Sequence, residues 1–474
     1  MQIIRTFKTP LALFALFAAA LALSPIPVKA AAPFDNLVAK AAVLVESDSG
    51  AVLFEHNKDM HHPADGLTRV MTMILALTAV GNGDANLGEF IVMTDSALSG
   101  LPSTGMANRI RSGEEMTLID LMYCAFIGGS TEACNLIAEH IAGSVDAFVV
   151  MMNERAELIG CENTNFTNPH GVHNDNQYTT AYDMFLIYRE ALTFPVFEDI
   201  SGTFRYTIEP TNKTDSRRLT GSNSLLNTAG KYYFRSCTSG LASITYEGGH
   251  SFVGAAESEG LAQIVVVLGS DVVMLPDESA EMRNLTEAAR LFQWGFAEFS
   301  WRTILSTGMI VAKAAVLHGD GADYVNLCPE SDIRLLIDND VPDSDFINNV
   351  IIYADRDREP LIAPVEAGDV LGEVTVTRRD PKTGKLIVYD TLRLVANTDV
   401  KLNRLQFVKM QLDDALSSRT ARLIVWILTV LVIGYVGLVI RYNVMRSKRA
   451  KKIREAKIKL IEERQHESDW DGWD

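Results

Sequence analysis

Serine chemistry is the first possibility that this sequence raises. A serine becomes a nucleophile when a base takes its proton, and a lysine three residues later on a helix is one arrangement that supplies the base. No serine in the 474 residues has a lysine at that spacing. Ser130 lies just before a helical pattern and is a candidate nucleophile, but neither lysine nor histidine lies near it in the sequence.

Two histidine pairs raise the question of a metal site. These are His61-His62 and His170 with His173. A structural or catalytic zinc site needs further His, Cys or carboxylate ligands at short, regular spacing. Neither pair has them. We therefore expect no metal and no cofactor.

The elements that must position any such residues form an α/β pattern. Two apolar runs, 42–45 and 51–54, flank Asp48-Ser49-Gly50 and predict a β-hairpin. The run Ile264-Val265-Val266-Val267 predicts a buried strand within 262–268. Helical periodicity follows the segments 67–78, 118–127, 132–141, 145–159 and 278–299.

A second pattern begins near Met309 and continues to Val400. Short strand-like runs alternate with turns, which predicts a small all-β domain. A literal Lys382-Thr383-Gly384 follows Asp380-Pro381 and has the composition of a hairpin turn.

Both ends of the chain carry targeting signals. Arg5 and Lys8 precede an apolar run and a small-residue cleavage site, which predicts a signal peptide, with a retained N-terminal anchor as the alternative. The uncharged run 423–440 is long enough to span a bilayer, unless it is a buried core helix. Nine Lys/Arg against one Glu follow in 441–459, which predicts a cytoplasmic tail and an extracytoplasmic bulk. The tail can serve as this topology signal with anionic-lipid contact, or it can bind a partner.

Charge and cysteine content narrow the class further. The whole chain carries −17, and residues 31–418 alone carry −25. Such a surface repels phosphate backbones and excludes nucleic acid as a partner. Five cysteines are too few and too scattered for a disulfide framework. Cys124 and Cys134 are expected to be buried thiols, with a disulfide between them as the alternative.

Several segments resemble the low-molecular-mass penicillin-binding proteins, the D-alanyl-D-alanine carboxypeptidase family. The resemblance runs collinearly from about residue 35 to residue 405. It is carried by the first hairpin and by the segments 113–117, 138–144, 163–171, 178–184 and 363–372. It implies a penicillin-binding/serine β-lactamase-like α/β (α+β) domain, an antiparallel sheet with helices on both sides, followed by a small all-β domain. The expected layout is a signal peptide (1–30), the carboxypeptidase-like domain (31–304), the β-domain (305–402), a linker (403–422), one transmembrane helix (423–440) and a basic tail (441–474).

The catalytic motifs that the resemblance implies are not intact. The Ser-x-x-Lys motif falls on Gly66 and Arg69, and a gap that places Asp65 at the serine position restores no serine. Glycine has no side chain to acylate, and arginine stays protonated, so it cannot be the base. Ser-x-Asn falls on Gly129-Ser130-Thr131, and Lys-Thr-Gly on Thr238-Ser239-Gly240.

The remaining polar groups at these positions favour binding over turnover. Arg69 can bind a peptide carboxylate in a remodelled cleft, or it can pair with Asp65 or Glu132. Ser130, Thr238, Ser239 and Gly240 are further candidate ligand-binding positions. We therefore predict an inactive, membrane-anchored relative that binds peptidoglycan stem peptide or a cell-envelope partner protein. The alternatives are an active serine carboxypeptidase that uses Ser130 or Ser239, and a transmembrane adaptor that acts through its tail.

Overall fold

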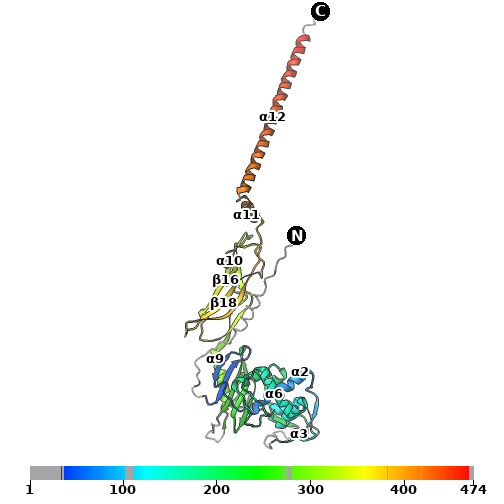
Figure 1. Cartoon of the computed structure of the whole chain (residues 1–474), viewed down its shortest axis with the longest axis vertical. Helices are drawn as coiled ribbons and strands as arrows, with labels where there is room; N and C mark the ends of the chain where they lie inside the picture. Colours follow the sequence, from blue (N-terminus) through cyan, green and yellow to red (C-terminus); the bar gives the residue numbers. More distant parts are fainter. Residues whose placement is uncertain are drawn as a thin grey trace, which may run out of the picture. The chain divides into compact units, whose positions relative to one another are not determined.

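The computed structural model describes residues 34, 37–101, 110–271, 273–274, 280–381, 383–417 and 419–468. The predicted signal peptide lies outside these residues. The chain divides into two compact units (Figure 1). Unit 1 holds the described part of residues 1–303 together with 334–345. Unit 2 holds residues 304–333 and the described part of 346–474.

A five-stranded antiparallel sheet lies at the centre of unit 1, in the order β2-β1-β9-β8-β7. The predicted hairpin is β1 paired with β2, and the predicted buried strand is part of β9. Residues 264–268 have no exposed surface, which explains their unbroken apolar sequence. The five strands are β1 (Ala41–Glu46), β2 (Val52–His56), β7 (Cys237–Thr245), β8 (Gly249–Ser258) and β9 (Leu261–Ser270).

Helices cover both faces of this sheet, as predicted for the fold. One face packs on α2 and on α4 to α8, and the other packs mainly on α9. Several of these helices begin at a Ser or Thr whose hydroxyl accepts a backbone N–H, as Ser130 does for α5. The helices are η1 (Asp65–Thr68), α2 (Arg69–Asn82), α3 (Asp95–Leu98), α4 (Leu118–Phe126), α5 (Thr131–Ala142), α6 (Val145–Ile159), α7 (Ala181–Ala191), α8 (Pro195–Ser201), η2 (Ser224–Leu226) and α9 (Arg283–Glu298).

Short two-stranded sheets complete unit 1 and lead out of it. They pair β3 with β4, β5 with β6, β10 with β11 and β12 with β15. Their bounds are β3 (Phe90–Val92), β4 (Glu115–Thr117), β5 (Arg205–Ile208), β6 (Arg217–Thr220), β10 (Val273–Met274), β11 (Ala280–Glu281), β12 (Phe299–Leu305) and β15 (Ile333–Asp338).

Unit 2 contains the predicted all-β domain, a six-stranded sheet in the order β16-β18-β19-β14-β13-β17. Thr383 and Gly384 lie in the turn between β18 and β19, where the Thr383 hydroxyl donates to Asp380, while Lys382 lies outside the described residues. Its elements are β13 (Ala312–Leu317), β14 (Tyr324–Pro329), β16 (Phe346–Ile352), α10 (Tyr353–Asp357), β17 (Leu361–Ile362), β18 (Val370–Arg379) and β19 (Leu386–Ala396). The short helix η3 (Asp343–Asp345), which precedes β16, belongs to unit 1.

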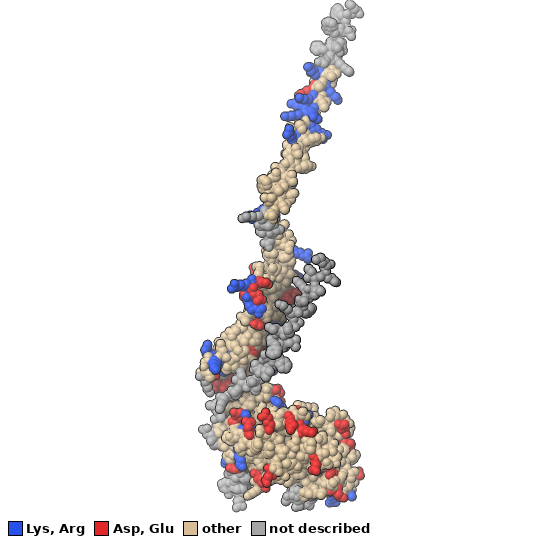
Figure 2. Space-filling model, viewed as in Figure 1, with Lys and Arg blue, Asp and Glu red and all other residues tan. Residues whose placement is uncertain are grey.

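The chain ends in two helices, α11 (Arg404–Ser417) and α12 (Arg419–Ser468). Within the described residues, α12 is the single helix that is by itself long and apolar enough to cross a membrane. Its most apolar 18-residue stretch has a mean hydropathy of 2.8 and is not buried by the other parts of the chain that the structure describes. Figure 2 shows this stretch free of charge and followed along the same helix by a group of Lys and Arg.

Candidate active site

Gly66 lies in η1, the short turn that leads into α2, and is buried there. Its N–H donates to the Ser243 hydroxyl oxygen at 3.1 Å. A Cβ atom added to Gly66 would lie 2.6 Å from Nη2 of Arg69 and 2.8 Å from Oγ of Ser243. The space that a serine side chain needs at this position is therefore already filled.

Arg69 fills that space because its side chain folds back over the start of its own helix. Nε donates to the Gly66 carbonyl at 2.8 Å, and Nη1 donates to the carbonyls of Ala125 and Phe126, each at 3.2 Å. Ala125 and Phe126 end α4, where carbonyl groups have no partner within the helix and carry its negative dipole end. The guanidinium therefore caps α4 from a helix that begins 49 residues earlier in the chain.

This cap explains how a cation with 9% exposure is tolerated. Burial lowers the pKa of Arg69, but an arginine remains protonated at neutral pH. Among the described residues Arg69 forms no ion pair. The pairing with Asp65 or Glu132 that the sequence suggested is therefore not formed. The carbonyl oxygens and the helix dipole stabilise the charge in place of a carboxylate.

The second predicted motif lies against the same guanidinium. Gly129 has a left-handed backbone with φ of +66°, and a Cβ there would lie 3.1 Å from Nη1 of Arg69. Ser130 is fully buried, and its Oγ accepts the Ala133 N–H as the N-cap of α5. Thr131 is 5% exposed. Gly66 and Gly129 thus both leave room for the arginine side chain.

Asp65, the extra residue before Gly66, is accommodated by a strained backbone and two glycines. Its φ is +44°, an uncommon value for a residue with a side chain. A Cβ on Gly171 would lie 1.8 Å from the Asp65 carbonyl oxygen, and a Cβ on Gly248 would lie 1.7 Å from Oδ2. Burial raises the pKa of the Asp65 carboxyl, and the hydrogen bond that Thr245 donates at 2.6 Å opposes this shift. Nδ1 of His173 lies 4.0 Å from Oδ1.

The third predicted motif is not at this site. Thr238 lies five residues from Ser243 along β7, which is roughly 16 Å at the usual rise of a strand. The β7 residues that meet Asp65 and Gly66 are Thr245 and Ser243. The triplet that reaches Gly66 is therefore Leu241-Ala242-Ser243 instead of Thr238-Ser239-Gly240, and it also lacks a lysine. Aligning the third motif by its distance from the Gly248-Gly249 turn would have placed it at Leu241-Ala242-Ser243 from the sequence.

The other predicted chemical groups stay apart from this site or have structural roles. His170 accepts the Val172 N–H on Nδ1, and burial lowers its pKa to about 4. The described histidines belong to no group of three close metal-ligating atoms; the group that does occur consists of three carboxylates, Glu298, Asp338 and Asp340. The five cysteines, all within the described residues, form no disulfide, so the alternative of a bond between Cys124 and Cys134 is not realised.

The fold agrees with the comparison to known families. The family model described as D-alanyl-D-alanine carboxypeptidase matches residues 27–272, more than half of the chain. The chain belongs to this family. The resemblance inferred from the sequence is confirmed, as are the α/β fold and the C-terminal β-domain.

Individual members of the D-alanyl-D-alanine carboxypeptidase family match over most of their length. DacF of Bacillus subtilis is 26% identical over 341 residues, covering 72% of this chain and 82% of the relative. DacC of Escherichia coli is 26% identical and covers 71% and 79%. The structure of penicillin binding protein 5 from Haemophilus influenzae matches with 25% identity and a TM-score of 0.57, covering 79% of this chain and 100% of that one. Penicillin binding protein 6B from Escherichia coli, at 19% identity and a TM-score of 0.58, shares the fold.

Proposed function

We propose that this member of the carboxypeptidase family does not acylate and acts outside the cell as a membrane-anchored binding protein for peptidoglycan peptide. The observation that carries the proposal is the buried contact between Gly66 and Arg69. Gly66 offers no nucleophile, and Nη2 of Arg69 and Oγ of Ser243 take the place where its side chain would be. The Gly66 N–H, a natural donor to a developing oxyanion, donates to Ser243 instead.

The serines considered as substitute nucleophiles are poorly placed for attack. Ser130 uses its oxygen as a helix cap and is fully buried. Ser239 accepts a hydrogen bond from the Tyr188 hydroxyl at 2.8 Å and lies on the distant part of β7. Neither hydrogen bonds to a histidine or lysine among the described residues, so neither has a base to remove its proton.

Anchoring by α12 completes the proposal. A helix whose most apolar stretch is not buried by the described residues, and which continues into nine basic residues, suits a single span with the tail in the cytoplasm. This orientation places the carboxypeptidase-like domain at the outer face of the membrane. An adaptor role for the tail, or a protein partner in place of the peptide, would use the same topology.

The deciding experiment is labelling of the full-length protein with a fluorescent penicillin, followed by intact-mass measurement. Penicillin binding protein 5 from Haemophilus influenzae serves as the positive control. We expect no covalent mass shift, because an adduct requires a nucleophile. A stoichiometric adduct on the unmodified chain would refute the proposal, and peptide mapping would then identify the serine responsible.

A further inference from the structure

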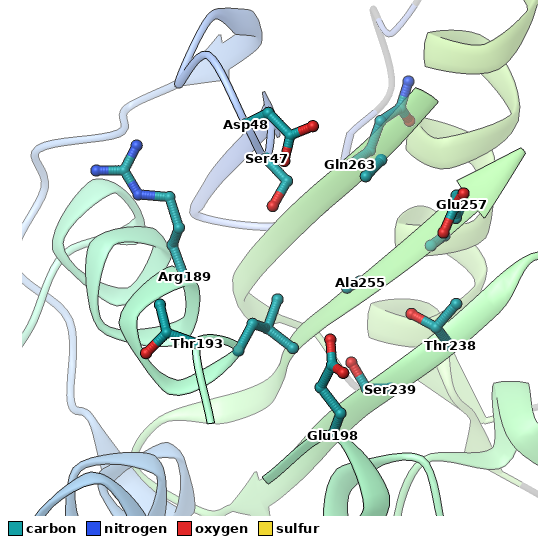
Figure 3. A pocket seen from close by; sticks show the side chains of 13 residues that line it. Ser47, Asp48, Arg189, Thr193, Glu198, Thr238, Ser239, Ala255, Glu257 and Gln263 are labelled. Atoms are coloured by element: carbon teal, nitrogen blue, oxygen red, sulfur yellow. The ribbon is translucent and has the colours of Figure 1, made fainter. Parts of the chain in front are cut away.

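A hollow of about 630 Å³ lies in unit 1 at the end of the central sheet away from Gly66. Figure 3 shows Ser47 and Asp48 on the turn after β1, Thr238 and Ser239 on β7, and Arg189 and Glu198 on helices around the strand ends. Its volume lies within the range of pockets that hold small ligands. The predicted ligand-binding residues Thr238 and Ser239 therefore line a site of their own.

Two features of the fold build this hollow. Helix α7 ends at Ala191, and Leu192 and Thr193, which follow it, line the hollow. The side chains of the sheet that line the hollow are mostly short, among them Ala255, Ala262 and Ser47. The register of β7 against β8 shifts between Cys237 and Ser239, so Thr238 is the extra residue of a bulge and lies at the hollow. Bulges redirect side chains in this way and often lie next to binding sites.

The charged groups of the lining define what can bind. Three carboxylates, Asp48, Glu198 and Glu257, line it together with one cation, Arg189. None of the four appears in an ion pair of the described residues, and the Arg189 guanidinium lies over the Phe185 ring, 5.0 Å from its centre. At the base of the hollow, the buried Ser239 hydroxyl accepts a hydrogen bond from the Tyr188 hydroxyl. The proton of the Ser239 hydroxyl remains available for a hydrogen bond to a ligand. Three carboxylates beside one guanidinium suit a ligand that carries a primary ammonium group and, separately, a carboxylate.

We propose that this hollow, which we call the strand-end pocket (Ser47, Asp48, Arg189, Glu198, Thr238, Ser239, Glu257), binds a short peptide that carries a side-chain ammonium group and a free C-terminal carboxylate. The ammonium group binds among Asp48, Glu198 and Glu257, and the carboxylate binds at Arg189. The inference rests on the proposed function for the choice of a wall-type peptide. It moves recognition from the filled cleft at Gly66 to a second place on the same domain.

The test is isothermal titration calorimetry of the full-length protein in detergent with two synthetic peptides. One is Nα-acetyl-lysyl-D-alanyl-D-alanine, and the other is the same peptide with the lysine amine acetylated. We expect millimolar or tighter binding of the free amine, and about fivefold weaker binding of the acetylated form, the size of one solvent-exposed ion pair. Equal affinity for the two peptides, or no binding of the free amine at 10 mM, would overturn the proposal.

Variants place the binding site. Thr238→Trp places a large side chain in the hollow from an exposed position and should abolish binding of the free-amine peptide. The double variant Asp48→Asn with Glu257→Gln should weaken binding of the free-amine peptide about fivefold or more and leave binding of the acetylated peptide unchanged. Glu154→Gln, an exposed acid on α6 outside the pocket, is the matched control and should bind normally. Loss of binding in Arg69→Lys with normal binding in the pocket variants would assign the peptide to the cleft and refute the strand-end pocket. Penicillin labelling is independent of these outcomes, so an adduct would refute the proposed function alone.

Discussion

Restoring a serine at Gly66 should destabilise the protein unless Arg69 is also changed. The new Cβ would lie 2.6 Å from Nη2 of Arg69 and 2.8 Å from Oγ of Ser243, closer than van der Waals contact allows. Overpacking of this kind costs about 1–3 kcal/mol. The Gly66 backbone is not left-handed, so the serine also gains about 0.4–1 kcal/mol through the unfolded chain. The expected net loss for Gly66→Ser is therefore about 1–2 kcal/mol.

Arg69→Lys alone should also destabilise, for a different reason. The shorter side chain loses the hydrogen bonds to the carbonyls of Ala125 and Phe126, which end α4. A buried acceptor left without a partner costs about 1–3 kcal/mol. When both substitutions are combined, the serine enters the space that the guanidinium has left. The double variant should be more stable than the sum of the single effects predicts, by about 1–2 kcal/mol.

The measurement is a double-mutant cycle on the full-length protein in detergent, by urea or thermal unfolding. Gly81→Ser is the matched control, because a Cβ on Gly81, in the helix α2 that Arg69 begins, meets no atom within 4 Å. It should be neutral or slightly stabilising. Additivity of Gly66→Ser and Arg69→Lys within about 0.5 kcal/mol would refute the claim that the arginine occupies the serine site.

Further predictions concern acylation, pH, topology and domain boundaries. Gly66→Ser with Arg69→Lys should acquire slow, detectable acylation by penicillin, whereas Gly66→Ser alone should show little, because Arg69 cannot accept the proton; equal labelling of the two would contradict this. The free energy of unfolding should fall as the pH drops from 6.5 towards 4, by up to about 3 kcal/mol from His170. Burial holds the pKa of His170 near 4 in the folded protein, so the unfolded chain binds the proton first. His170→Asn should flatten this pH dependence in unfolding measurements. Protease added to wall-stripped cells should remove residues 31–418, and protection of that segment would reverse the topology. Limited proteolysis of the chain should release a fragment of roughly 270 residues that ends near residue 305, and resistance at that point would count against the predicted boundary.

Much of the architecture was predictable from local pattern. The hairpin β1–β2, the buried strand β9 and the apolar run of α12 follow from periodicity and turn residues that lie close together in the sequence. The two residues on which the proposed loss of acylation rests were equally visible in the sequence. A glycine at position 66 and an arginine at position 69 have the same chemical limits in any fold.

Contacts between distant segments could be decided only by the tertiary structure. Thr238 lies away from Gly66 because β7 reaches that site at Ser243, and the bulge at Thr238 places this residue at the strand-end pocket. Arg69 binds the carbonyls that end α4, 56 and 57 residues away, because among the described residues no carboxylate pairs with its side chain, whereas carbonyls without a partner in their helix reach it. A sequence shows which groups are present, whereas register and the points at which helices end determine which of them meet.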